Sequence, residues 1–156
     1  SPSTPSSQPA AERRAAESTM RALLATIAPT QEQLTATVRR WLRARLPAAH
    51  ELVYEYADCV VLSFSPSGRG MEGILGIRTS EDEVRVYFNP GKGLADPEKL
   101  LQGTAKLTRW ITVESAATLK RPAVVALVDQ AIARNRIPFV HTGLGPVTIQ
   151  SLRSKK

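Results

Sequence analysis

The chain has 156 residues, a mass of 17.0 kDa and a net charge of +7. This length suits one domain with its own core, and a lone cysteine, Cys59, excludes an intrachain disulfide framework. No apolar run approaches the ~20 residues of a membrane-spanning helix, and the N-terminus is polar where a secretory signal is apolar, so we expect a soluble cytoplasmic domain with no membrane partner and no cofactor.

Residues 1–19 are rich in serine, proline and alanine and hold no large aliphatic side chain before Met20. Such a segment cannot bury enough surface to offset its loss of conformational entropy, so the pattern predicts a disordered tail, with a frayed helix from Ala10 as the alternative. We expect residues 20–140 to form a single domain. Residues 141–156 are predicted to be a basic C-terminal tail with a weak strand pattern at 146–152.

A first amphipathic helix is predicted after Pro29. Thr30 and Gln33 have the spacing of a capping box, apolar residues recur at helical spacing, and the helix is expected to end before Pro47. Three arginines fall outside its apolar stripe: Arg39, Arg40 and Arg43. We expect them to face solvent, with an anionic partner as the alternative.

Strand-like runs follow at 51–57, 59–65, 71–79, 83–89 and 107–113. The loops between the first four are short, which favours antiparallel neighbours. A short helix is predicted from Asp96 and Pro97 to Gly103, and a final helix at 121–135 begins with Pro122. The order predicts an α+β fold, in which an antiparallel or mixed sheet of about five strands packs against N-terminal and C-terminal helices.

The chain holds few groups typical of metal or nucleophilic chemistry. The soft metal ligands are far apart in sequence and have no paired spacing: His50, His141 and Cys59. Cys59 begins an apolar strand and is expected to pack as a small hydrophobe. Glu51 and Glu55 share one face of a strand and, with Asp58, could form an oxygen-rich metal site, although an exposed strand face is the simpler interpretation.

Glycines and basic residues gather between residues 89 and 109. A Walker loop is excluded because its glycines and lysine are not followed by serine or threonine at the required spacing. Backbone N–H groups near Gly91 and Gly93 could still meet an anion, with Lys92, Lys106 and Arg109 as charge partners. These three basic residues are the predicted anion-binding site, and the alternative is a turn with a helix terminator.

Nucleic acid is not the expected anionic partner. The positive charge is spread through the chain, and the aromatic residues nearest to it, Trp41, Trp110 and Tyr54, are not interleaved with arginine as in single-strand binders. A small anionic ligand is the favoured partner.

Residues 87–132, with the upstream segment 51–67, resemble the YdhG-like family of bacterial domains of unknown function. The matching positions are Gly91, Leu94, Asp96, Pro97, Leu100, Leu101, Gly103, Lys106 and Arg109. The resemblance implies a compact α+β domain and no established activity. One branch of the family is linked to frataxin-like iron handling, which implies an acidic surface, whereas the helix predicted after Pro29 has Glu32 as its only acid.

These observations predict a small binding module with a basic anion-binding surface. Two alternatives stay open: a frataxin-like iron carrier that uses Glu51, Glu55 and Asp58, and a homodimeric interaction module. No constellation of residues indicates an enzyme.

Overall fold

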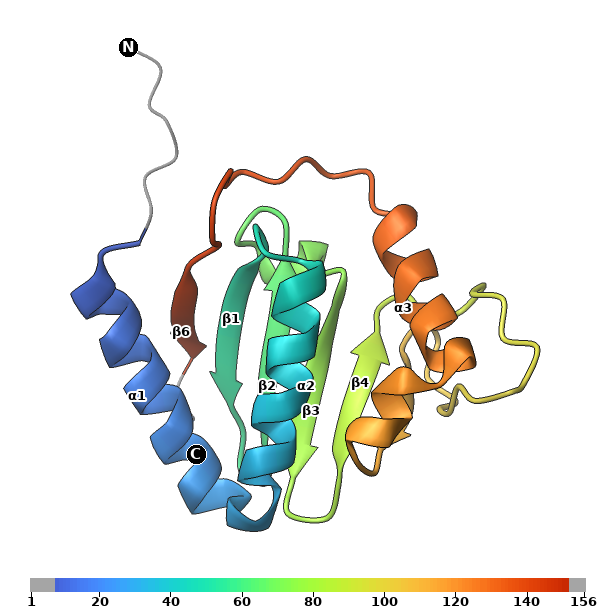
Figure 1. Ribbon diagram of the computed structural model, residues 1–156, viewed down its shortest axis with the longest axis horizontal. Coiled ribbons are helices and arrows are strands. Elements are labelled where there is room, and N and C mark those ends of the chain that lie inside the picture. The colour runs from blue at the N-terminus through green and yellow to red at the C-terminus, as the bar shows by residue number, and fades with distance from the viewer. Residues whose placement is uncertain (1–7, 152–156) are drawn as a thin grey trace.

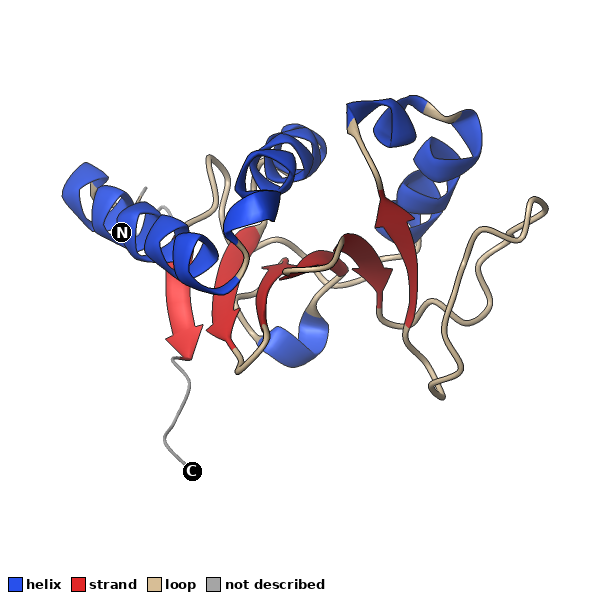
Figure 2. Ribbon diagram, turned by 90° about the horizontal axis from the view of Figure 1, so that it is seen from below, coloured by secondary structure: helices blue, strands red, loops and turns tan. Residues whose placement is uncertain are grey.

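The computed structural model describes residues 8–151, and residues 1–7 and 152–156 lie outside the description. Three α-helices lie on one side of a six-stranded mixed sheet (Figures 1 and 2): α1 (Ala10–Ile27), α2 (Glu32–Arg45) and α3 (Pro122–Ala133). The predicted α+β class is confirmed. No helix in the described part of the chain is both long and apolar enough to cross a membrane.

The sheet has the strand order β5-β4-β3-β2-β1-β6. Its strands are β1 (His50–Glu55), β2 (Cys59–Ser65), β3 (Leu75–Ser80), β4 (Val84–Phe88), β5 (Arg109–Val113) and β6 (Val147–Ser151). All neighbours are antiparallel except β6, which runs parallel to β1. The chain therefore crosses from β5 through α3 to the opposite edge, beside α1 (Figure 1). The weak strand pattern at 146–152 is confirmed as β6, which is an integral strand of the sheet and not part of a tail.

Strand register places alternate side chains under the helices. Leu62 of β2 pairs with Ile77 of β3, which pairs with Val86 of β4, and all three are buried. α2 adds Val38 and Leu42, which are also fully buried and lie one helical turn apart. The apolar pattern of α2 and of the predicted strands follows from this burial.

At the N-terminus, the predicted disordered tail lies outside the described residues at 1–7 and is wrong for residues 10–19, which belong to α1; the alternative, a helix that begins at Ala10, is confirmed. Ala16, Met20 and Leu24 recur every four residues and are buried. The Gln8 amide also ties the start of the helix to β6: its Nε2 donates to the Val147 carbonyl at 2.8 Å, and its Oε1 accepts from the Val147 N–H at 2.9 Å. Packing against the sheet edge replaces the missing large apolar side chains.

Two other local predictions are wrong. The capping box at Thr30 does not form, since a 3-10 helix, η1 (Pro29–Gln31), precedes α2, and no side chain caps α2. No helix forms at 96–103 either; Asp96 instead accepts the backbone N–H groups of Leu100 and Leu101, each at 2.8 Å. Two further 3-10 helices occur, η2 (Gly70–Glu72) and η3 (Ala116–Lys120).

Candidate functional site

A groove of about 770 Å³ runs between α1 and α2. The charged residues that line it are Arg13, Glu17, Arg21, Glu32, Arg39, Arg40 and Arg43. The apolar residues that line it include Met20, Leu24, Ala36 and Leu144. Five arginines against two glutamates give this groove a positive charge.

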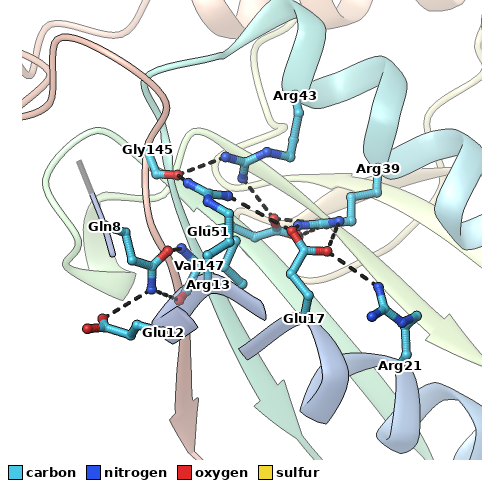
Figure 3. Close-up of polar contacts among 10 residues, drawn as sticks. All are labelled: Gln8, Glu12, Arg13, Glu17, Arg21, Arg39, Arg43, Glu51, Gly145 and Val147. Atoms are coloured by element: carbon cyan, nitrogen blue, oxygen red, sulfur yellow. Dashed lines mark hydrogen bonds and ion pairs between the residues drawn. The ribbon is translucent and has the colours of Figure 1, made fainter. Parts of the chain in front are cut away.

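Helical spacing brings these side chains together. Arg13, Glu17 and Arg21 are four residues apart along α1, and Arg39 and Arg43 are four residues apart along α2. Each set therefore lies on one face of its helix, and the two faces meet above β1 (Figure 3).

Glu51 of β1 is the innermost charge of the site. Its side chain is 0% exposed, and both of its oxygens accept hydrogen bonds from Arg39 Nε at 2.8 and 2.9 Å. Arg43 Nη1 donates a third hydrogen bond at 2.8 Å. A buried carboxylate is costly unless it is paired and hydrogen-bonded, and two arginines meet both conditions here. The interpretation of Glu51 as part of an exposed strand face is wrong.

Arg39 links three elements. Its terminal nitrogens donate to the two oxygens of Glu17 on α1, each at 2.9 Å, while its Nε contacts Glu51 on β1. Parallel N–H···O bonds of this kind are the strong, bidentate form of the arginine–carboxylate pair. The expectation that these arginines face solvent is wrong for Arg39 and Arg43, whose side chains are only 15% and 11% exposed.

The segment before β6 is held by the same cluster. Arg13 Nη2 and Arg43 Nη2 both donate to the carbonyl oxygen of Gly145, at 2.6 and 2.8 Å. Two guanidinium groups on one carbonyl concentrate positive charge at this end of the groove. Neither the first half of α1 nor residue 145 was predicted to be near α2, because both lie in segments interpreted as tails.

Positive charge exceeds negative charge around Arg43. Burial, together with the charges of Arg39 and Arg13, outweighs the attraction of Glu51 and lowers the pKa of Arg43. Burial would raise the pKa of Glu17, but the hydrogen bond and charge of Arg39 and the charges of Arg43 and Arg13 lower it overall. An added anion would therefore be favoured at this end of the groove.

Two arginines at the rim of the groove have little or no pairing with acidic side chains. Arg21 is 60% exposed and reaches Glu17 only at 3.8 Å. Arg40 is exposed and has no hydrogen bond or ion pair within residues 8–151. Both side chains are available to a ligand in the groove.

The basic residues that the sequence singled out lie elsewhere. Arg109 Nη1 donates to the Ala105 carbonyl and, at 2.8 Å, to the Thr108 carbonyl, so its guanidinium closes its own loop. Lys92 and Lys106 have exposed side chains. The groove is lined by other residues, and the anion site at Lys92, Lys106 and Arg109 stays a prediction.

The predicted metal ligands are used differently. Glu51 binds two arginines, whereas Asp58 is exposed in the turn between β1 and β2. Residues 8–151 hold no group of three or more histidine, cysteine or acidic side chains arranged for a metal ion. Cys59 is buried, and burial raises the pKa of its thiol, as a packing role requires.

Two distant histidines meet at the edge of the sheet. The ring centroids of His50 and His141 are 5.6 Å apart in an edge-on arrangement, and His50 Nε2 lies 2.7 Å from Thr148 Oγ1 on β6. Burial, then the charges of His141 and Arg43, lowers the pKa of His50. The sequence carried no signal for this contact, because β6 was not placed beside β1.

No protein family, curated protein or solved structure matches the chain. The resemblance to the YdhG-like family therefore stays a prediction. The groove is interpreted from its own geometry and charge.

Proposed function

We propose that this domain binds a small anionic ligand in the groove between α1 and α2. The observation that carries the proposal is the charge of the groove: five arginines line it, and the three carboxylates on or beneath it, Glu17, Glu32 and Glu51, leave an excess of two positive charges. Its volume of about 770 Å³ lies in the range of roughly 300–1,000 Å³ typical of sites for small organic ligands.

The packing of the site supports binding by a rigid surface. Arg39 and Arg43 are fixed by hydrogen bonds to β1, so they present their charge without losing side-chain freedom when a ligand arrives. The exposed rim arginines add attraction and steer the ligand. The inner arginines hold the fold together, and the rim provides the residues whose removal tests the function.

The test is a calorimetric and thermal-shift screen with phosphate, sulfate, citrate and acetate. R21Q/R40Q removes the two rim charges, and R14Q/R69Q removes two exposed charges outside the groove. An exposed ion pair contributes about 0.2–1 kcal/mol, so loss of two should weaken binding of the best anion about two- to thirty-fold while the control keeps wild-type affinity. Equal affinities in both variants would place binding elsewhere.

The same screen tests the other predictions. Loss of anion binding in K106A/R109A would assign the ligand to the loop of Lys92, Lys106 and Arg109. The iron-carrier alternative predicts saturable binding of micromolar iron, and the arginines around Glu51 do not favour it. Sedimentation velocity tests the homodimer alternative.

A further inference from the structure

The proposed anion site also carries information about the class of its ligand, in an inference that rests on that function. We infer that the groove takes a carboxylate attached to an apolar chain, as in a fatty acid, and that the ligand's carboxylate replaces Glu17 on Arg39.

Arg39 already holds a carboxylate from the groove side. Its Nη1 and Nη2 donate to the two oxygens of Glu17, which comes from a different helix and is 21% exposed. The guanidinium is set in this orientation by Glu51, which occupies Nε from beneath. A free carboxylate that enters the groove meets the same pair of donors in the same plane.

Glu17 has two other arginines nearby with which it can form an ion pair. Arg21 lies 3.8 Å away and Arg13 lies 3.9 Å away, each one helical turn along α1. When Glu17 leaves Arg39, it can therefore pair with an arginine of its own helix and stay at the rim. The exchange swaps one carboxylate for another on Arg39 and leaves no buried charge without a partner.

The groove continues away from this point along α1 and the first turns of α2. From Arg13 to Leu24 it follows α1 over a rise of about 16 Å. Past Glu17 its walls combine the apolar side chains of Met20, Leu24 and Ala36 with polar side chains from the first turns of α2, and the aliphatic stems of the arginines add carbon surface. A simple inorganic anion would leave this part empty, whereas an alkyl chain would fill it.

The ligand therefore needs one charged end and an apolar body. Its charged end lies beside Arg39 and Arg43, and its apolar body extends toward Leu24. A polyanion such as citrate matches the arginines at the charged end of the groove but has no apolar chain to extend toward Leu24. A neutral alcohol of the same chain length has the apolar chain but no charge to pair with the arginines.

The experiment measures the binding of octanoate, decanoate and dodecanoate by calorimetry, each below its micelle concentration. The comparison ligands are acetate, inorganic phosphate, dodecanol and dodecyl phosphate. Because burial of a methylene strengthens binding about fourfold at most, we expect Kd to fall about two- to fourfold for each methylene added. Dodecanol should bind at least ten-fold more weakly than dodecanoate.

Two matched variants test the exchange. E17Q removes the carboxylate that competes for Arg39, and E12Q makes the same charge change on an exposed part of the same helix. We expect E17Q to bind dodecanoate about three- to ten-fold more tightly than wild type, because it lacks the internal competitor, and E12Q to bind like wild type. The Arg39 Nε–H resonance in a ¹⁵N NMR titration should shift with the ligand.

Each contrary result has a distinct meaning. Binding of acetate or phosphate without any effect of chain length overturns this inference and leaves the proposed anion site standing. Tighter binding of dodecyl phosphate than of dodecanoate overturns the carboxylate assignment. Weaker binding by E17Q overturns the exchange, and no binding of any anion overturns both proposals.

Discussion

Replacing Glu51 by glutamine tests how much the buried carboxylate contributes to the free energy of unfolding. Glutamine keeps the size of the side chain but removes the charge that faces Arg39 and Arg43. Removing one partner of a buried ion pair costs about 3–5 kcal/mol. Arg39 keeps Glu17, and both arginines retain some exposure, so we expect a loss of about 2–4 kcal/mol.

The assay is urea denaturation at pH 7, with a thermal melt as a second measurement. For a domain of this size 1 kcal/mol corresponds to about 2–4 °C in Tm, so E51Q should melt about 5–15 °C below wild type. E12Q is the control, and as an exposed substitution it should stay within about 0.5 kcal/mol of wild type.

A double-mutant cycle separates the ion pair from other effects. E51Q, R43Q and the double variant should give a coupling energy above about 1 kcal/mol, since the two side chains are in direct contact. If E51Q loses less than about 1 kcal/mol, the cluster does not stabilise the fold in the way described. A coupling energy near zero would refute the pairing itself.

Three further predictions concern pH and backbone packing. The pKa of Glu17 is lowered, so its carboxylate stabilises the fold above the unfolded value of 4.5 and loses this effect as the pH falls through the folded pKa. In urea denaturation E17Q should therefore be less stable than wild type at pH 7, and the difference should shrink as the pH falls below 4.5. Burial lowers the pKa of His50, so stability should decrease as the pH drops below 6.5; H50Q should abolish that decrease in Tm, and an unchanged slope would contradict this. A Cβ at Gly145 would collide with the Ala49 carbonyl, so G145A should lose about 2–4 kcal/mol, whereas G143A, in open space, should behave like wild type.

Much of the fold followed from local patterns. α2 and α3 carry apolar residues at helical spacing, β4 alternates between buried and half-buried residues, and β2 is a continuous apolar run that is buried on both faces. The helix at 96–103 failed because Asp96 uses its carboxylate to cap a loop and Gly103 packs its backbone against the ring of Trp110. The same residue types occur in loops and at helix ends, so the sequence did not distinguish the two.

α1 and β6 gave only weak signals, a helix from Ala10 as an alternative to disorder and a weak strand pattern at 146–152, and their places in the fold could not be predicted. The first half of α1 has only alanine on its buried face, and its position depends on Gln8, Arg13 and Glu17 reaching β6 and α2. β6 depends on an edge strand to pair with, and this edge exists only after β1 is in place. Both segments acquire their structure from partners that are distant in sequence.

The sequence by itself determined the α+β class, the positive charge and the helical spacing that puts Arg39 and Arg43 on one face of α2. Only the tertiary structure decided where that face points. Glu51 lies twelve residues from Arg39, Glu17 lies twenty-two residues away, and the Gly145 carbonyl joins them from the far end of the chain. From sequence alone a charged side chain is predicted to be exposed to solvent. Its burial is favourable only when a group of opposite charge lies beside it, and the sequence does not show that group.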